Sequence, residues 1–132
     1  MPRNGRHNQK TLPFHKARRL FNRPTYKLIS RKIIGNKRFD TSFSNGEDSL
    51  FMFLISDKIC KCRFTSPEAV YYRRYREGSA FTSHHSLWSK IKNSTKLAFT
   101  MSGYYLRNIR GYNIGFLYTR IRGLVASVIK DN

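Results

Sequence analysis

The chain has 132 residues, and its 26 lysine and arginine residues against 7 aspartate and glutamate residues give a formal net charge of +19 at pH 7. That length predicts one domain, or one domain with a tail. Aromatic residues make up 14% of the chain, which excludes a wholly disordered protein. Its two cysteines exclude a disulfide-stapled scaffold. The sequence has no apolar run of about 18 residues, the length that a membrane-spanning helix needs.

The positive charge is the strongest signal for function. A surplus of nineteen charges on a small domain repels itself unless a polyanion neutralises it. Nucleic acid fits this role, because each neutralised phosphate releases condensed counterions. Membrane-binding proteins usually place their charge on one amphipathic helix with a clean apolar face, and solubility needs only a few net charges. The sequence therefore predicts a nucleic-acid partner, no membrane partner and no small-molecule substrate.

The charge is concentrated near the start of the chain. Residues 1–38 hold 12 lysine and arginine residues and two histidines, and Asp40 is the first acidic residue. Prolines interrupt any long helix in this stretch, so we expect at most a short helix over residues 15–22. Asn45 and Gly46 form a turn signal that marks the start of the folded part. We expect residues 1–48 to be an extended basic arm that orders on a partner.

A second interpretation of this start stays open. An arginine-rich, acid-free beginning is also typical of a mitochondrial transit peptide. Such peptides are usually serine-rich and amphipathic, whereas this stretch is rich in asparagine, proline and aromatic residues. The segment is then either a targeting peptide that is removed or an RNA-binding extension that is kept.

The predicted folded domain covers residues 49–132 and begins with strands. Residues 49–56 are apolar and aromatic, which is typical of a buried strand. After a turn, residues 60–65 alternate in polarity, so that Lys61 and Arg63 share one exposed face and Cys60, Cys62 and Phe64 share the other. The two strands are expected to pair as a hairpin.

The rest of the domain alternates helix and strand. Ser79 is a candidate cap for a helix over residues 79–92 that has an apolar stripe at helical spacing. Residues 97–101 alternate again and predict a third strand, and residues 124–129 predict a last short strand. A glycine-rich loop lies between them. This order predicts an α/β architecture, with helices packed on a sheet.

Two segments are the best candidates for contact with RNA. Residues 71–76 contain three arginines among three tyrosines; arginine makes bidentate phosphate contacts, and both side chains stack on unpaired bases. The plainer interpretation is a solvated loop whose tyrosines cover the core. In residues 110–115 two glycines let backbone N–H groups approach a phosphate at a helix start, although a simple connecting turn explains them as well. This segment matches no nucleotide-binding fingerprint.

The residues that we expect to contact RNA are all basic. They lie in the arm, on the second strand, in the Tyr/Arg segment and around the glycine-rich loop: Arg18, Arg19, Arg23, Arg31, Lys32, Lys61, Arg63, Arg73, Arg74, Arg76, Arg107, Arg110, Arg120 and Arg122.

The sequence predicts no metal site, no cofactor and no catalysis. Cys60, Cys62, His84 and His85 have the wrong spacing for zinc, because adjacent histidines on a helix point about 100° apart. We expect two buried thiols in a reducing compartment instead. No motif gathers the seven carboxylates into a two-metal site, and no context supports a serine or cysteine nucleophile.

At the Tyr/Arg segment the chain resembles the universal small-subunit ribosomal protein S-eleven family. Residues 72–84 align without a gap to the arginine-rich segment that opens a helix in that family, with Arg73, Arg76 and Phe81 matching outright. Residues 55–57 are similar to the family's hairpin turn. Two family glycines are replaced here, by Tyr71 and Arg74, and the chain lacks the family's basic C-terminal tail.

The end of the chain shows a weaker resemblance. Residues 121–124 are similar to a helix of the family and residues 129–131 to the end of its last strand. A second register also fits, in which residues 97–103 are a strand and the start of the family's lysine–glycine loop and residues 115–116 are the end of the helix. Both registers stay open.

The resemblance implies a ribonuclease-H-like fold, a mixed sheet with helices packed on it, without a nuclease site. It implies a structural protein that binds rRNA in the platform of the small ribosomal subunit, beside neighbouring platform proteins. A composition rich in phenylalanine, tyrosine, lysine and asparagine suggests a diverged mitochondrial form, located on the ribosome in the matrix. The alternative is a free-standing organelle RNA-binding or ribosome-assembly factor.

Overall fold

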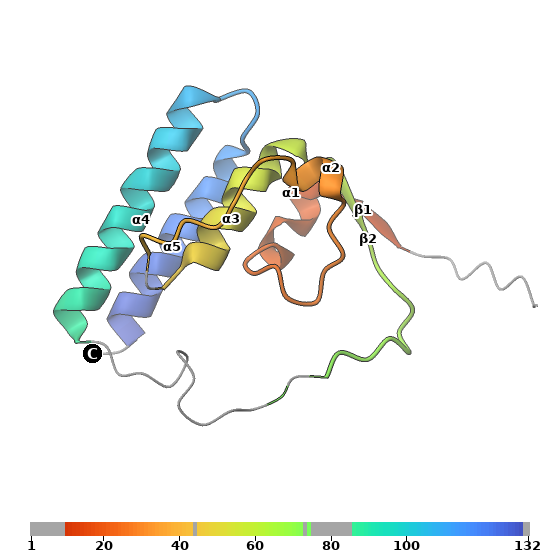
Figure 1. Ribbon diagram of the computed structural model, residues 1–132, viewed down its shortest axis with the longest axis horizontal. Helices are drawn as coiled ribbons and strands as arrows, with labels where there is room; N and C mark the ends of the chain where they lie inside the picture. The colour runs from red at the N-terminus through yellow and green to blue at the C-terminus, as the bar shows by residue number, and fades with distance from the viewer. Residues whose placement is uncertain (1–9, 44, 73, 75–85, 131–132) are drawn as a thin grey trace, which may run out of the picture.

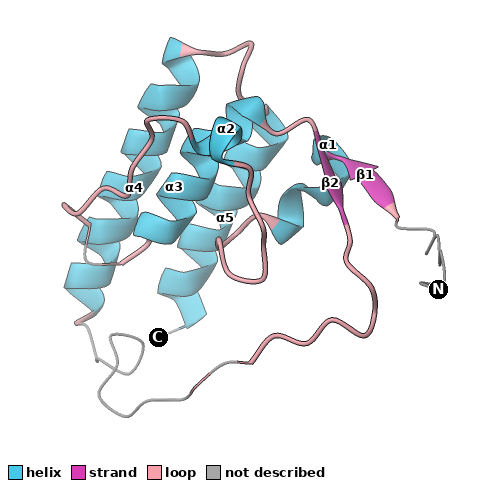
Figure 2. Cartoon of the chain, turned by 45° about the vertical axis from the view of Figure 1, so that its right-hand side comes forward, coloured by secondary structure: helices cyan, strands magenta, loops and turns pink. Residues whose placement is uncertain are grey.

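The protein is mixed α/β, mostly helical, with a small two-stranded antiparallel sheet (Figures 1 and 2). The computed structural model describes residues 10–43, 45–72, 74 and 86–130. Their elements, in chain order, are β1 (Thr11–Pro13), α1 (Phe14–Ala17), the 3-10 helix η1 (Arg18–Leu20), α2 (Arg31–Ile34), α3 (Glu47–Ile55), the 3-10 helix η2 (Ser56–Lys58), β2 (Lys61–Arg63), α4 (Leu87–Arg107) and α5 (Ile114–Lys130).

Helices α4 and α5 form an antiparallel hairpin, and α3 packs against both (Figures 1 and 2). Ser86 caps α4, because its hydroxyl accepts a hydrogen bond from the backbone N–H of Ser89 at 3.3 Å. At the start of α5, the side-chain oxygen of Asn113 accepts a bond from the N–H of Phe116 at 2.9 Å. Side chains thus satisfy backbone groups at the start of both helices.

The core is aromatic and lies where α3 meets the hairpin. Phe53 of α3 and Phe116 of α5 are fully buried, with ring centroids 5.9 Å apart. Phe14 of α1 meets Phe116 edge to face at 5.3 Å. Leu97 and Met101 close the core from α4. Burial of each such side chain contributes about 1.5–3 kcal/mol, so this cluster is the main source of stability.

The strand predicted for residues 49–56 is wrong, because these residues form helix α3. A short continuous apolar run does not distinguish a buried strand from a buried helix by its periodicity. Here the helix is enclosed on most of its circumference from Leu50 to Ile55, where every side chain is apolar. Glu47 and Asp48 in its first turn favour a helix start, and Gly46 precedes it with a positive φ of 90°.

The strands predicted for residues 97–101 and 124–129 are also wrong, since both segments lie within long helices. The alternation at residues 97–101 hides a helical spacing: Leu97 and Met101, one turn apart, are the two buried positions. The predicted helix over residues 79–92 is confirmed from Leu87 onward and continues to Arg107. Its expected cap lies outside the described residues.

The strand predicted for residues 60–65 is confirmed as the shorter β2, but it does not pair with residues 49–56. Its partner is β1, in a register that places Leu12 opposite Cys62. Both of these side chains pack against the core, while Lys61 and Arg63 are exposed, as predicted. Cys60 was expected to be a buried thiol and is exposed instead, because it lies at a polar cavity that Asp57 and Arg110 also line.

The described part of the predicted arm folds onto the core. Phe14, Ala17 and Phe21 are buried, at a spacing that places them on one helical face. The short helix expected within residues 15–22 is confirmed in part by α1 and η1. Phe43 is also buried, beneath the ammonium group of Lys96 at 4.3 Å. An extended arm is therefore not confirmed, and neither is a ribonuclease-H-like sheet.

Candidate nucleic-acid interface

The described part of the chain keeps the strong positive charge. It contains 22 lysine and arginine residues and 5 acidic residues, a formal net charge of +17. The ion pair between Lys37 Nζ and Asp57 Oδ1, at 2.5 Å, neutralises one charge of each sign. Most of the positive charge therefore has to be balanced by counterions or by an anionic partner.

The two-stranded sheet presents a basic outer face. Lys61 and Arg63 are two residues apart on β2, so both point away from the core, and both are exposed. Lys10 is exposed at the end of this ribbon, where its carbonyl accepts a bond from the N–H of Phe64 at 3.1 Å. By the alternation of the strands it lies on the same face as Leu12, opposite to Lys61 and Arg63. Lys16 of α1 is exposed. Lys10 and Lys16 are absent from the set predicted from the sequence.

The predicted arginines of the N-terminal third differ in their environment. Arg19, Arg23, Arg31 and Lys32 are exposed. Arg18 is half-buried: its guanidinium donates to the backbone carbonyl of His15 and lies against the start of α5. Its position indicates a packing role.

Arg120 is also used within the fold. Its guanidinium donates to the side-chain oxygen of Asn22 and lies 5.1 Å from the ring centroid of Phe116. Burial lowers the pKa of Arg120. The Arg120 side chain thus connects α5 to the segment after η1. Less of the side chain is available to a phosphate than the sequence predicted.

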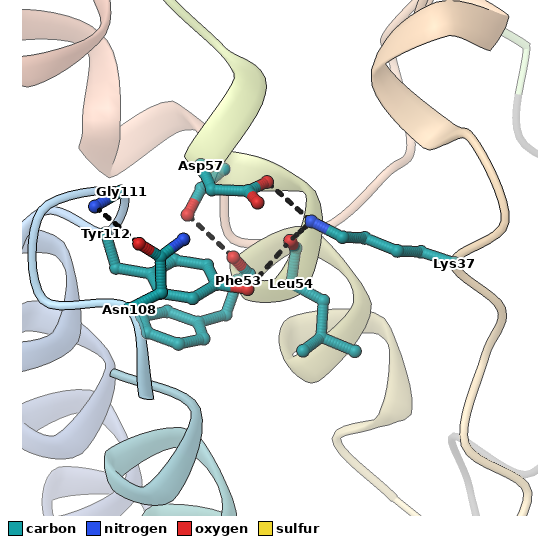
Figure 3. Close-up of polar contacts among 8 residues, drawn as sticks. Lys37, Phe53, Leu54, Asp57, Asn108, Gly111 and Tyr112 are labelled. Carbon is teal, nitrogen blue, oxygen red and sulfur yellow. Dashed lines mark hydrogen bonds and ion pairs between the residues drawn. The ribbon is translucent and has the colours of Figure 1, made fainter. Parts of the chain in front are cut away.

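Asn108 satisfies part of the backbone of the glycine-rich loop. Its side-chain oxygen accepts from the N–H of Gly111 at 3.0 Å (Figure 3), and its carbonyl accepts from the N–H of Tyr112 at 3.1 Å. These two N–H groups of the predicted phosphate-binding segment are therefore already bonded. Arg110, at the tip of this loop, is exposed and offers a guanidinium to an anion.

A polar cavity of about 260 Å³ lies between this loop, α1 and η2. His15 and Arg110 line it together with Asp57 and Cys60. Asp57 is already paired with Lys37. An imidazole and a guanidinium at one cavity suit a single anionic group, such as a phosphate.

The Tyr/Arg segment is partly described. Tyr71, Tyr72 and Arg74 are exposed, and Tyr72 keeps 90% of its surface. The ring of Tyr71 meets that of Tyr26 at 4.2 Å. Tyr71 and Tyr72 therefore do not cover the core, and the exposed ring of Tyr72 is free for stacking. Arg73 and Arg76 lie outside the described residues.

The remaining predicted residues lie on the hairpin. Arg107 lies 6.0 Å from the ring centroid of Tyr104 at the end of α4, and Arg122 is exposed on α5. The β1–β2 sheet is at the opposite side of the molecule from α4 (Figures 1 and 2). The predicted set therefore does not gather into one patch.

Neither a cluster that could hold a metal ion nor a helix that could span a membrane occurs in the described residues. Cys60 and Cys62 are free thiols, and no three histidine, cysteine or acidic side chains of the described ranges are arranged to hold a metal ion. His84 and His85 lie outside those ranges. Among the described helices, none combines the length and apolar character needed to cross a membrane.

No protein-family model, no curated protein and no solved structure matches this chain. The residues and their geometry therefore carry the functional proposal.

Proposed function

We propose that this protein binds RNA as a structural, non-catalytic component of a ribonucleoprotein particle. The observation that carries the proposal is the net charge of +17 on the described residues, together with the exposure of most of their basic side chains. Such a surface gains affinity for a polyanion through counterion release, whatever the sequence of the nucleic acid. Contacts of this kind position a protein on RNA.

The β1–β2 sheet is the proposed phosphate-binding surface. Lys61 and Arg63 lie on one face of a short, paired ribbon, so their backbone positions are fixed before binding, and the backbone of Lys10 bonds at the end of the same ribbon. Arg110 and His15 supply a further contact at the polar cavity. Fixed positions reduce the ordering cost of binding.

The Tyr/Arg segment is proposed to recognise unpaired bases. Tyr72 exposes nearly its whole ring, and Arg74 follows it two residues later. Aromatic rings and guanidinium planes both stack on bases that are not in a helix. This segment would then add preference for single-stranded or looped RNA to the general attraction of the basic surface.

In its most specific form the proposal places the protein in the small subunit of a mitochondrial ribosome, with rRNA and platform proteins as partners. The resemblance of residues 72–84 supports this assignment. The helices at residues 47–55 and 114–130 replace two of the predicted strands, whereas residues 121–124, which are similar to a helix of the family, lie in a helix here. The ribonuclease-H-like fold and the matrix location stay predictions.

A free-standing organelle RNA-binding or assembly factor is the second candidate. The observation in its favour is the aromatic core, which joins residues 14–21 to α3, α4 and α5. A protein with such a core is expected to fold and remain stable alone, whereas many ribosomal proteins order fully only on their rRNA.

The test is the salt dependence of RNA affinity for the full chain and two matched variants. We expect Arg63→Ala to reduce the slope of log affinity against log salt by about one contact. Lys92→Ala removes the same charge from exposed α4, at the opposite side of the molecule, and is expected to leave the slope unchanged. Equal slopes for the full chain and Arg63→Ala would contradict the proposed surface.

A further inference from the structure

An apolar groove runs between α4 and α5. Its cavity volume is about 370 Å³, and residues of both helices line it, among them Ile91 and Phe99 of α4 and Leu124, Val125 and Ile129 of α5. Three small hydroxyl residues of α4 are the only polar side chains in the lining, and none of the lining residues is charged. The groove is separate from the buried side of α4, where Leu97 and Met101 meet the core.

The side chains along this groove are exposed to an unusual degree for their size. Phe99 keeps 74% of its surface, Ile129 keeps 66% and Val125 keeps 54%. Trp88 keeps 76% and lies seven and eleven residues before Thr95 and Phe99, which places it on the same strip of α4. A contiguous apolar strip that is exposed to solvent is typical of an interaction site.

Positive charges border the groove on both helices. Lys92 is exposed and lies one turn from Trp88 and Thr95 on α4. Arg122 is exposed and lies one turn from Tyr118 and Val125 on α5. Residues 87–130 contain no aspartate or glutamate. The groove therefore combines an apolar floor with positive edges, and its best complement is apolar on one face and acidic at its flanks.

We propose that this groove binds an amphipathic helix of a partner protein, whose apolar face fills the space between α4 and α5 and whose acidic flanks pair with Lys92 and Arg122. A helix lying in an apolar groove is a common mode of peptide recognition. The inference goes beyond RNA binding and does not rest on it. It gives the protein two surfaces: the basic sheet and this groove.

The charge and shape of the groove disfavour the other occupants. A second copy of the chain would bring the same positive edges together, which costs free energy. RNA would find no charged group in the groove lining. An anionic bilayer is flat on the scale of the hairpin and would not fill a concave groove of this volume. A separate acidic amphipathic helix satisfies the apolar floor and both edges at once.

The test uses the full chain and the fluorescence of Trp88, its single tryptophan. The probes are three peptides of about 18 residues, or five helical turns: an amphipathic leucine–glutamate helix, a scrambled peptide of the same composition, and an amphipathic leucine–lysine helix. We expect the first peptide alone to shift the emission to shorter wavelength with saturation, and to bind at least about tenfold more tightly than the scrambled peptide, a factor worth about 1.4 kcal/mol.

Matched variants separate the groove from general charge attraction. Val125→Asp and Ala126→Asp change the charge of α5 equally at adjacent exposed positions, but only Val125 lines the groove. We expect Val125→Asp to abolish the saturable shift and Ala126→Asp to retain it. Phe99→Ala, at another exposed position, is expected to weaken binding without loss of helix by circular dichroism.

Four results would overturn the inference. They are equal binding of the scrambled peptide, equal binding of the leucine–lysine helix, a Trp88 shift produced by anionic phospholipid vesicles but by no peptide, and a shift that follows protein concentration together with dimer formation in sedimentation. The last two would assign the groove to a membrane surface or to a second copy of the chain.

Discussion

The ring of Tyr112 stacks on that of Phe53, with centroids 4.8 Å apart and planes at 15°. The Tyr112 hydroxyl also donates to the carbonyl of Leu54 at 3.2 Å, close to the end of α3 (Figure 3). The ammonium group of Lys37 donates to the same carbonyl. One residue of the α4–α5 loop thus fixes that loop to the core, and with it the position of Arg110, two residues earlier.

Tyr112→Phe is expected to destabilise the fold by about 1 kcal/mol, because it removes the hydrogen bond to Leu54 and keeps the stacked ring. Tyr112→Ala is expected to cost about 3 kcal/mol or more, since the ring is 8% exposed and its loss leaves a cavity beside Phe53. Urea unfolding followed by circular dichroism measures both values. Equal costs for the two variants would show that the ring contributes nothing beyond its hydroxyl.

Tyr112 also predicts a dependence of stability on high pH. Burial, with a smaller contribution from the charge of Asp57, raises the pKa of Tyr112 to about 12 from an ordinary value of 10.0. The folded state therefore holds this proton more tightly than the unfolded state, so the contribution of Tyr112 is complete below pH 10 and is lost as the pH rises towards 12.

Absorbance at the phenolate band checks this titration. We expect Tyr112→Phe to remove one ionisation step near pH 12 from the titration of the folded protein. Titration curves of the parent and Tyr112→Phe that coincide near pH 12 while the protein is still folded would refute the assignment.

The ion pair between Lys37 and Asp57 is expected to contribute a coupling free energy of about 1 kcal/mol, because both side chains are partly buried and the bond is charge-assisted. A double-mutant cycle with Lys37→Met and Asp57→Asn isolates this term. Asp57→Asn is expected to lower the free energy of unfolding more when Lys37 is present than when it is replaced by methionine. In the first case the Lys37 ammonium group is left without its carboxylate. Strictly additive effects would mean that the pair is not coupled.

Glycine substitutions should divide into two groups. Gly46 has a φ of +90°, and a Cβ atom there would lie 2.6 Å from buried Leu97, so Gly46→Ala is expected to destabilise the fold by about 1–3 kcal/mol. Gly123 lies inside α5 with no atom within 4 Å of a Cβ, so Gly123→Ala is expected to stabilise it by up to about 1 kcal/mol. Thermal unfolding of both variants tests the signs. A Gly46→Ala protein as stable as the parent would contradict the placement of Leu97.

Two arginines of the predicted set should behave differently when replaced. Arg110→Ala is expected to weaken binding to an rRNA fragment and to reduce the salt slope by about one contact, with no change in unfolding. Arg120→Ala is expected to lower the unfolding midpoint, because that side chain packs on Phe116 and bonds to Asn22. Weaker RNA binding in Arg120→Ala together with a lower unfolding midpoint in Arg110→Ala would contradict both assignments.

Local signals in the sequence predicted part of this fold. The alternation around Lys61 and Arg63 predicted the correct strand and its exposed face. The turn predicted at Gly46 lies directly before the first residue of α3. The apolar run at residues 49–56 had no period to read, and Leu97 and Met101 satisfy both a strand and a helix pattern. The pairing of β1 with β2 is a long-range contact that no local pattern contains.

The candidate site shows the same division. Composition alone predicted a polyanion partner, since charge does not depend on the fold. Which arginines are free depends on packing: Arg120 and Arg63 are equivalent in the sequence, yet one lies on Phe116 and the other is exposed. Backbone N–H groups of the glycine-rich loop were expected to meet phosphate, but Asn108 already accepts bonds from two of them, those of Gly111 and Tyr112.

Sedimentation of the tagged protein from gently lysed mitochondria, in low and then in high salt, tests the central proposal most directly. The proposal of a structural ribosomal component predicts co-migration with small-subunit rRNA that survives high salt, because contacts to a protein partner keep the chain in the particle when salt weakens its phosphate contacts. A slow peak free of rRNA already at low salt would contradict it and would favour a free-standing RNA-binding factor.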